Sequence, residues 1–480
     1  MLDKYRPNFH FTPKMNWMND PNGMVYFQGA YHLFYQYHPY GNQWGPMYWG
    51  HAISPDLVHW EHYPIALEPD EHGTIFSGSA VVDWHDTSGF FGGQPGLVAI
   101  FTHHDRVPET DRKRERQSLA YSSDAGKTWN KYENNPVLVN EDCPDFRDPK
   151  VFWYQPSEQW VMLVASGHSI RIYHSPDLKN WTFVSAFGEG EGSHTGVWEC
   201  PDLFPLPIDG DPLQTKWVML VSIGRAYEIS SGIQYFIGDF DGSTFVNNSS
   251  PEEVRWLDLG KDNYAGVTWS DIPAEDGRTI YIGWMSNWKY ANQTPTGSWR
   301  GAMTIPRELE LATRNGQLTL IQRPIRELKA IRKPIFAIKD SDMNEVQQQL
   351  ADIQLVSYEI IAVFEFDYDA EDFGIKVRKS QANETVIEYS PSSGDLILDR
   401  TQSGDCSFHD AFARTHTVQV KADRNLKLNV FVDSSSVEVF ANDGEQVITD
   451  LIFPEWEDQG IEVFARGEAV RLQSLEIFSL

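Results

Sequence analysis

A short segment recurs along the first 290 residues, and this repeat limits the folds that the chain can adopt. It reads SPDLVHW ending at Trp60, SSDAGKTW ending at Trp129, SPDLKNW ending at Trp181 and GDFDGSTF ending at Phe245, with a weaker fifth copy, WMSNW, ending at Trp288. The intervals of 69, 52, 64 and 43 residues each fit four short strands with their loops. The repeat therefore predicts a β-propeller of about five blades.

The runs between the repeat copies are short, apolar and flanked by residues that favour turns. MVYFQ, YHLFYQY, GLVAIFTH and WVMLVAS are typical, and helical periodicity is scarce. Such runs predict many short antiparallel strands. In a propeller the innermost strand of every blade lines a common axial channel, so residues far apart in the sequence meet there.

The character of the sequence changes near residue 323. The basic segment RPIRELKAIRKP has apolar residues at 325, 328 and 331 and predicts a short helical linker that ends at Pro334. Beyond it, runs such as LVSYEIIAVFEF, LNVFVD and SSVEVF predict a β-sandwich, in which Asp433 and Glu438 are expected to face solvent. The predicted organisation is all-β, with a five-bladed β-propeller at 1–324, a linker at 325–345 and a C-terminal β-sandwich at 346–480.

Charge and cysteine content exclude several classes of function. The net charge of −29 and the pI near 4.8 disfavour contact with phosphate backbones, so no nucleic-acid partner is expected. Cys143, Cys200 and Cys406 form no disulfide framework and match no zinc-ligand spacing, and no metal or other cofactor is expected. The N-terminal sequence lacks an apolar signal core, and no apolar run is long enough to span a membrane. The expected location is cytoplasmic, or extracellular if an N-terminal signal has been removed.

Three acidic motifs stand out because their carboxylates lie among aromatic, Pro and Gly residues. They are WMNDPNG at 17–23 with Asp20, FRDPK at 146–150 with Asp148, and WECPDL at 198–203 with Glu199. Such carboxylates are expected to be partly buried, and burying an unpaired charge is costly. Each motif precedes the repeat segment of its own unit, so the three acids are expected to converge at one end of the channel.

Each motif also has an ordinary structural explanation. NDPNG is turn chemistry, in which Asp20 would only shape a loop, and Arg147 with Asp148 would be an ion pair at the start of a strand. Glu199, between a Trp and a Cys, is harder to explain in this way. Two carboxylates in one pocket acquire different pKa values, which supplies an acid and an anion. Glycoside hydrolysis needs such a pair.

Taken together, the motifs resemble glycoside hydrolase family thirty-two, which includes invertases, inulinases and levanases. The resemblance rests on WMNDPNG, FSGS at 76–79, FRDPK, WECPDL, YIGWMSNW and WRGAMTIPREL at 299–309, in the order found in the family, and FVDSSSVEVF at 431–440 looks like its C-terminal module. It spans nearly the whole chain, and the N-terminal part is most similar to bacterial levanases. It implies a retaining, exo-acting β-fructofuranosidase that releases terminal fructose from sucrose, inulin or levan without a cofactor.

The resemblance also implies roles for individual residues. Asp20 would be the nucleophile, Glu199 the general acid and base, and Asp148 the residue that stabilises the transition state by holding ring hydroxyls. Arg147 would keep Asp148 ionised and reach substrate hydroxyls. The other residues expected to contact fructose or to wall its pocket are Asn19, Gln36, Trp44, Trp49, Phe76, Ser77, Asp262, Tyr264 and Trp288.

Two other functions fit parts of the sequence. An inverting hydrolase of arabinose or xylose polymers, from the related five-bladed group, would also use three acids, and a silent propeller would bind fructan without hydrolysing it. The 13% aromatic content suits both β-sheet cores and stacking on sugars. The basic run RKRER at 112–116 is expected to be a solvated loop, and Cys200 a small buried apolar residue. Linkage and chain-length preference, exo or endo attack, transfructosylation and a homo-oligomeric state stay open.

Overall fold

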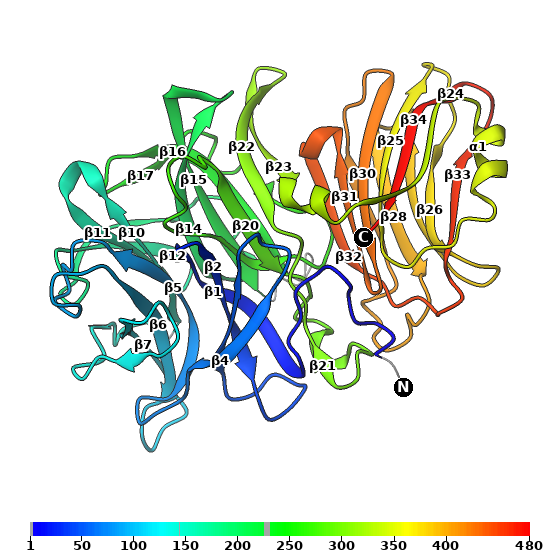
Figure 1. The fold of residues 1–480 in the computed structure, drawn as a ribbon. Helices are drawn as coiled ribbons and strands as arrows, with labels where there is room; N and C mark the ends of the chain where they lie inside the picture. The colour runs from blue at the N-terminus through cyan, green and yellow to red at the C-terminus, as the bar shows by residue number, and fades with distance from the viewer. Residues whose placement is uncertain (1–2, 144, 225–230) are drawn as a thin grey trace.

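Residues 3–143, 145–224 and 231–480 are described by the computed structural model. Two β-rich bodies lie side by side, an N-terminal β-propeller and a C-terminal β-sandwich, which confirms the predicted fold class (Figure 1). Within the described ranges there is one α-helix, α1 (Met343–Leu350), and no helix is long and apolar enough to cross a membrane.

The propeller is built from antiparallel sheets whose first strand lies nearest the axis. Blade one contains β1 (Asn16–Phe27), β2 (Ala30–His38), β3 (Tyr48–Ser54) and β4 (Glu61–Leu67), with β21 (Trp299–Arg300) parallel to β1. Blade two contains β5 (Thr74–Asp83), β6 (Gly96–Arg106), β7 (Lys113–Ser122), β8 (Asn130–Lys131) and β9 (Leu138–Val139). Blade three contains β10 (Phe146–Tyr154), η1 (Gln155–Ser157), β11 (Gln159–Ser166), β12 (Ser169–Ser175) and β13 (Thr182–Phe187).

Blades four and five are joined into one nine-stranded sheet by a parallel contact between Ile208 and Leu311. Blade four contains β14 (Val197–Ile208), β15 (Asp211–Gly224), β16 (Ser231–Phe240), β17 (Phe245–Asn247) and β18 (Arg255–Trp256). Blade five contains β19 (Tyr264–Thr268), β20 (Thr279–Trp284), η2 (Ala291–Gln293), β22 (Arg307–Arg314) and β23 (Gln317–Pro324).

The sequence repeat forms the turn between the third and fourth strands of a blade. In blade one, the hydroxyl of Ser54 donates to Asp56 (3.1 Å), two following backbone amides donate to the same carboxylate, and the indole of Trp60 donates to a backbone carbonyl (3.1 Å). Ser122–Trp129 and Ser175–Trp181 form equivalent turns. A side chain that satisfies the amides of its own turn explains why the segment recurs.

The innermost strands form a ring around the axial channel. β1 contacts β5, β5 contacts β10, β10 contacts β14, β14 contacts β19, and β19 contacts β1. In each strand the antiparallel ladder shifts register near the N-terminal end, at Asn19–Asp20, Ser77, Asp148–Pro149, Cys200–Pro201 and Ala265–Gly266. Such bulges take side chains out of the alternating pattern of a strand and re-aim them.

The C-terminal body consists of two sheets packed face to face around one apolar core. The six-stranded sheet has the order β24 (Lys333–Ser341), β34 (Val470–Ser479), β25 (Tyr358–Phe366), β30 (Asn425–Asp433), β31 (Ser436–Ala441) and β32 (Gln446–Leu451). The five-stranded sheet has the order β29 (Thr415–Gln419), β28 (Asp395–Gln402), β27 (Glu384–Ser390), β26 (Phe373–Lys379) and β33 (Gly460–Ala465). A short 3₁₀-helix, η4 (Asn442–Gly444), joins β31 to β32.

The segment expected to be a linker, residues 325–345, is partly built into the sandwich. A 3₁₀-helix, η3 (Arg326–Ala330), follows the last propeller strand. β24 then pairs with β34. Pro334 does not end the segment, because it lies in an edge strand, where a missing amide is tolerated.

Two predictions of solvated residues are wrong. Residues 113–116 of RKRER begin β7 instead of forming a loop, and Glu115 and Arg116 are 3% and 8% exposed. Asp433 and Glu438 are fully buried, because the N-terminal segment of the chain covers them. Alternation along a strand reveals two faces, but it does not tell whether the polar face meets water or another part of the chain.

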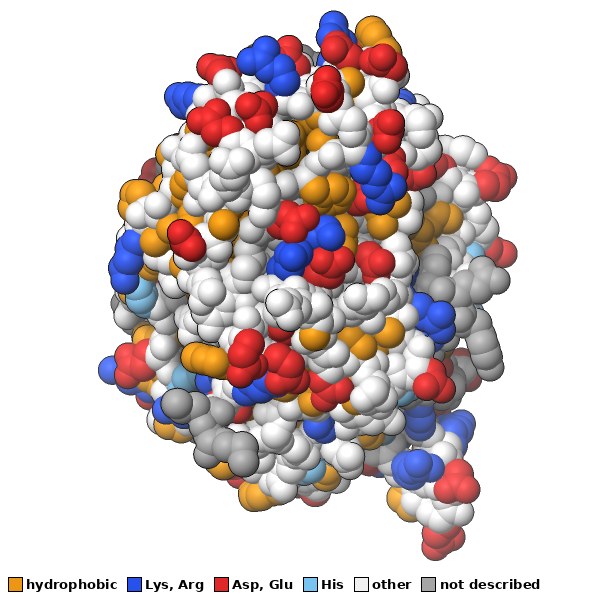
Figure 2. Space-filling model, turned by 90° about the vertical axis from the view of Figure 1, so that its right-hand side faces the viewer, with side chains coloured by type: hydrophobic (Ala, Val, Ile, Leu, Met, Phe, Trp, Pro, Cys, Tyr) orange, Lys and Arg blue, Asp and Glu red, His pale blue; other side chains and the backbone are white. Residues whose placement is uncertain are grey.

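The surface turned to the viewer in Figure 2 carries acidic and basic side chains interspersed, with small groups of hydrophobic side chains between them. Closely paired charges of both signs also occur in buried clusters.

One such cluster predicts how stability depends on pH. His10 lies between two buried carboxylates, with Nδ1 2.7 Å from Asp433 and Nε2 2.8 Å from Glu438, and Arg307 also pairs with Glu438. Burial lowers the pKa of His10, but the two carboxylates outweigh it and raise the pKa to about 9. Because the unfolded chain loses this proton near pH 6.5, the stabilisation is complete below that pH and is lost as the pH rises through 9.

We expect the free energy of unfolding of the wild-type protein to fall by about 2 to 3 kcal/mol between pH 6.5 and pH 9 from this source. His10→Gln should be less stable at pH 6 and should lack this part of the slope. Denaturant unfolding at both pH values measures the difference. Parallel slopes for the two proteins would contradict the charged state assigned to His10.

Candidate active site

A cavity of about 1060 Å³ opens at one end of the axial channel. Four innermost strands reach it, because β1 supplies Asp20, β5 supplies Ser77, β10 supplies Asp148 and β14 supplies Glu199. All three carboxylates predicted to be catalytic therefore share one cavity. Its complete lining is Asn19, Asp20, Gln36, Trp44, Phe76, Ser77, His104, Arg106, Lys113, Glu115, Asp145, Arg147, Asp148, Gly196, Val197, Glu199, Gly224, Trp288, Lys289 and Asn292.

A proline lies at or beside the bulge in three of these strands. Pro21, Pro149 and Pro201 stand where the ladder shifts register and needs no amide from them. Asp148 and Cys200 take φ values of 63° and 47°, in the left-handed region that non-glycine residues rarely adopt. Strain of this kind persists where the surrounding structure holds it in place. NDPNG is thus a bulge inside β1 and not a turn.

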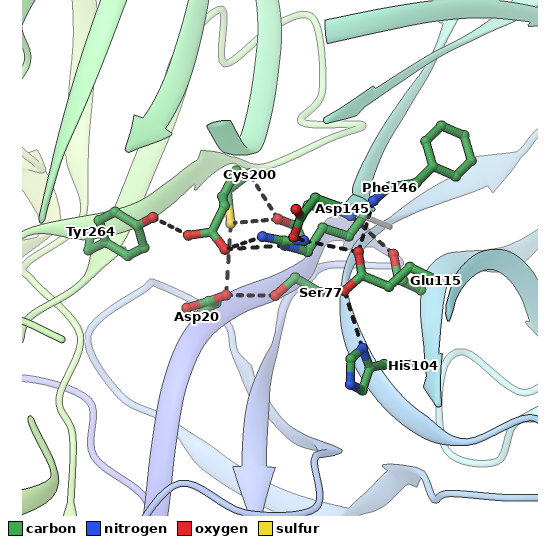
Figure 3. Close-up of polar contacts among 12 residues, drawn as sticks. Asp20, Ser77, His104, Glu115, Asp145, Phe146, Cys200 and Tyr264 are labelled. Atoms are coloured by element: carbon green, nitrogen blue, oxygen red, sulfur yellow. Dashed lines mark hydrogen bonds and ion pairs between the residues drawn. The ribbon is translucent and has the colours of Figure 1, made fainter. Parts of the chain in front are cut away.

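Asp20 is held by two hydrogen bonds from neutral groups. The amide of Asn19 donates to Oδ1 (3.0 Å), and the hydroxyl of Ser77 donates to Oδ2 (2.7 Å; Figure 3). Trp17 orients the Asn19 amide by donating to its oxygen (2.7 Å). Burial raises the pKa of Asp20 to about 6, although both hydrogen bonds lower it, and the charge of Glu199 raises it further.

Asp148 and Cys200 lie together beside Asp20. The backbone amide of Cys200 donates to Asp148 Oδ2 (3.0 Å), and its Sγ lies 3.5 Å from Asp148 Oδ2 and 3.8 Å from Asp20 Oδ2. Burial raises the pKa of Asp148 to about 8, although Arg147 lowers it. The charges of Glu199 and Asp20 add to this rise and Arg147 offsets it only in part, so the role of Arg147 in keeping Asp148 ionised stays a prediction. Burial and these carboxylates also raise the pKa of the Cys200 thiol, which disfavours a thiolate nucleophile.

Glu199 has a different environment from the two aspartates. Arg147 donates to its Oε1 from Nη2 (2.9 Å) and Nε (3.2 Å), and the hydroxyl of Tyr264 donates to its Oε2. Its side chain is 23% exposed. Glu199 is thus oriented on both oxygens and still accessible from the cavity, as a residue that exchanges protons with a substrate must be.

Glu115 was not predicted as a site residue, although it supports Arg147 from behind. It accepts from Arg147 Nη1 (2.9 Å) and from the Phe146 amide (2.8 Å), and His104 Nδ1 lies 3.2 Å from its other oxygen (Figure 3). The ring of His104 stacks on Phe76, 4.2 Å between centroids. In the sequence, Glu115 lies between basic residues and looks like part of a basic segment, so its position behind Arg147 is not recognisable.

Most residues predicted to bind substrate do line the cavity: Asn19, Gln36, Trp44, Phe76, Ser77, Arg147 and Trp288. Trp288 belongs to the fifth copy of the repeat, which follows β20 and forms no outer turn of a blade. It stacks on Trp17 with centroids 6.0 Å apart. The weak fifth copy of the repeat is therefore similar in sequence to the other copies but does not form the same turn.

Three predicted residues do not line the cavity. Trp49 is fully buried behind Phe76, whose carbonyl accepts from the Trp49 indole (3.0 Å). The hydroxyl of Tyr264 donates a hydrogen bond to Glu199, as described above. Asp262 is fully buried against the sandwich, where Arg400 donates to it (2.5 Å). Asp262 and Tyr264 are only two residues apart in the sequence, but Asp262 pairs with Arg400 and Tyr264 donates to Glu199.

In the described part of the chain, no group of three or more His, Cys, Asp or Glu side chains is placed to hold an ion. The chemistry of the cavity is that of carboxylates. Asp20 and Glu199 differ in both partners and exposure, so the cavity offers two carboxylates in different environments.

Sheltered carboxylates in a cavity at one end of a propeller channel, one of them oriented by arginine and tyrosine, define a glycoside hydrolase. The chain belongs to glycosyl hydrolases family 32. Residues 10–324 match the N-terminal domain of that family, and residues 327–479 match its C-terminal domain.

Curated relatives of this chain include bacterial and fungal enzymes. A levanase of Bacillus subtilis (strain 168) is 52% identical over 489 residues, which cover 100% of this chain and 71% of that protein. An extracellular exo-inulinase of Aspergillus niger is 40% identical, over 94% of this chain and 90% of that protein. A levanase of Bacillus sp. (strain L7) is 38% identical, and this chain spans 52% of its length.

Solved structures share the whole architecture. An exo-inulinase from Aspergillus awamori superposes with a TM-score of 0.91 at 36% identity, over 99% of this chain and 98% of that one. A fructofuranosidase variant from Schwanniomyces occidentalis in complex with fructosylnystose gives a TM-score of 0.88 at 33% identity, over 99% and 98%. Both bodies of the fold are included in these matches.

Proposed function

We propose that the protein is a retaining, exo-acting β-fructofuranosidase that removes terminal fructosyl units from sucrose, inulin or levan. The convergence of Asp20, Asp148 and Glu199 in one cavity carries the proposal. The relatives named levanase and exo-inulinase support the substrate class, and those named extracellular support action outside the cell. Residues 1–324 would form the catalytic domain and residues 346–480 the supporting one.

Asp20 is the proposed nucleophile and Glu199 the proposed acid and base. An oxygen of Asp20 attacks the anomeric carbon while Glu199 gives its proton to the leaving oxygen, which yields a fructosyl ester of Asp20 and the shortened sugar. Water then loses a proton to Glu199 and attacks the same carbon, which frees fructose and Asp20. Asp148 holds the ring hydroxyls as positive charge develops on the sugar.

The inner end of the cavity supports exo attack. Next to the cavity, a second space lined by Asp148 and Cys200 measures only about 20 Å³, about the space of one water. Further along the axis, Lys150 pairs with buried Asp202 (3.1 Å). A fructan chain therefore has no way out along the axis behind Asp148, which supports the binding of a chain end.

Product analysis tests the proposal. The purified protein is incubated with sucrose, inulin and levan, and the products are separated by chromatography. Fructose as the sole early product from the polymers is the expected result. A ladder of oligosaccharides would show endo attack, and fructan binding without any release of sugar would identify a silent sugar-binding propeller.

The anomer formed first separates the proposal from an inverting hydrolase of arabinose or xylose polymers. Proton NMR during sucrose hydrolysis should show β-fructofuranose before mutarotation, because two displacements preserve configuration. The α-anomer, or release of pentose from arabinan or xylan, would favour the inverting alternative.

Asp148→Asn should separate activity from stability. The folded protein keeps on Asp148 a proton that the unfolded chain loses near pH 4, so this residue destabilises the fold as the pH rises from 4 to 8. We expect the variant to be about 1 to 2 kcal/mol more stable at pH 8 and to lose ~10²-fold in kcat with little change in KM.

Thermal unfolding and sucrose kinetics measure the two effects. Asp202→Asn is the matched control, because it removes a buried carboxylate that is paired with Lys150 and should lower Tm. An Asp148→Asn protein that is less stable than wild type at pH 8, or one altered only in KM, would contradict the environment and role given to Asp148.

A further inference from the structure

We infer that Arg400, in the β-sandwich, is a positioning residue for the aromatic walls of the cavity, an inference that rests on the proposed function. Arg400 lies on β28 and is fully buried. It joins Asp262 and Tyr290 of the propeller in one hydrogen-bonded cluster. None of the three residues lines the cavity. The cluster therefore acts through residues that are close to Tyr290 in the chain.

The cluster fixes Tyr290 from the side of the sandwich. Arg400 donates from Nη1 to Asp262 (2.5 Å) and the Leu451 carbonyl (3.0 Å), from Nη2 to the Tyr290 hydroxyl (2.9 Å), and from Nε to the Phe412 carbonyl (2.9 Å). The Tyr290 hydroxyl donates in turn to the other oxygen of Asp262 (2.6 Å). A buried charge with this many partners holds its neighbours in one arrangement, because each alternative would leave a polar group unpaired.

The segment around Tyr290 contains one tryptophan of the cavity wall, Trp288, and is hydrogen-bonded to another, Trp44. Trp288, two residues before it, lines the cavity and packs on Trp17. Asn292, two residues after it, accepts a hydrogen bond from the backbone amide of Trp44 (2.8 Å), and Trp44 lines the cavity too. The sandwich therefore sets the position of both tryptophans through one tyrosine.

The cluster reaches the catalytic carboxylates only indirectly, because Tyr264, which donates to Glu199, lies two residues after Asp262 but is held in β19. Asp20, Asp148 and Glu199 lie on β1, β10 and β14, and none of the hydrogen bonds described for them involves Arg400, Tyr290 or Asp262. Displacing the walls should therefore weaken the hold on the sugar more than the chemical step. KM should rise while kcat and its pH dependence stay nearly constant.

Two variants and two matched controls test the inference. Arg400→Lys and Tyr290→Phe disturb the cluster. Arg307→Lys alters another fully buried arginine at the same contact between the two bodies, which pairs with Asp258 (3.0 Å) and Glu438 (2.6 Å). Tyr281→Phe removes another buried hydroxyl, which donates to Asn263 (2.7 Å). The controls report the loss of stability that any such change causes.

We expect KM for sucrose to rise at least ~5-fold in Arg400→Lys and Tyr290→Phe, with kcat within ~3-fold of wild type and both limbs of the pH profile unmoved. The controls should lower Tm to a similar extent and leave KM within ~2-fold. Unchanged KM in the Arg400 and Tyr290 variants, or equal changes in the controls, would reduce the cluster to a structural role.

Fluorine NMR of protein labelled with 5-fluorotryptophan gives a readout that does not need activity. The resonances of Trp44 and Trp288 are assigned with Trp→Phe variants. Both should shift in Tyr290→Phe and neither in Tyr281→Phe. Wild-type protein without activity on fructans would refute the proposed function alone, whereas stationary resonances would refute the positioning by Arg400 alone.

Discussion

Asp20→Asn is expected to lower kcat on sucrose by at least ~10³-fold, about 4 kcal/mol of activation free energy. The amide cannot form the fructosyl ester, and no second carboxylate occupies the same position. Asn19 and Ser77 donate to Asp20, and the Ser77 hydroxyl can also donate to the oxygen of an amide, so the fold should persist. Steady-state kinetics with sucrose measures the effect.

The matched control for this variant is Asp271→Asn. Asp271 is also a sheltered aspartate whose pKa is raised by burial, and it accepts from the Val82 amide (3.0 Å) and the Trp84 indole (2.8 Å) beyond the far end of β19. Its variant should keep kcat within ~3-fold of wild type. Activity of Asp20→Asn within tenfold of wild type, with the fold intact by circular dichroism, would falsify the assignment of the nucleophile.

Glu199→Gln is expected to show a loss that depends on the leaving group. With sucrose, kcat should fall at least ~10³-fold, because the glucose oxygen needs a proton as it departs. With p-nitrophenyl β-fructofuranoside, the initial burst of nitrophenolate should fall less than ~10-fold, since this leaving group departs unprotonated. The second step still lacks a base, so fructosylated protein should accumulate and appear in the intact mass.

Glu359→Gln is the matched control, since Glu359 is a buried glutamate that pairs with Arg332 in the sandwich (2.5 Å). It should leave the kinetics with both substrates unchanged. If Glu199→Gln lost activity equally with both substrates, Glu199 would not be the proton donor. An intact mass without the fructosyl adduct would argue against the base role.

The sequence predicts the propeller well because its repeat is a self-capping turn, whose geometry is local. Ser54 and Asp56 satisfy their own turn, so the pattern needs no distant partner. The carboxylates were recognisable for a related reason, since Asp20 and Asp148 precede prolines that a regular strand would not accept.

What the sequence could not show depends on contacts between distant segments. Glu115 looked like part of a basic loop until β7 placed it behind Arg147. From the sequence, Asp433 is expected to face solvent and Asp262 to bind substrate. Only the contact between the two bodies gives Asp433 its partner His10 and Asp262 its partner Arg400. The raised pKa of Asp148 likewise follows from burial among other carboxylates.

The narrow inner end of the cavity also bears on how successive fructosyl units are removed from one chain. Fructose freed beside Asp20 cannot leave through the space of about 20 Å³ behind Asp148, so the shortened chain has to withdraw before the product escapes. We therefore expect each cleavage to end one encounter, so that attack is distributive and all chains in a fructan sample shorten together instead of being consumed one by one.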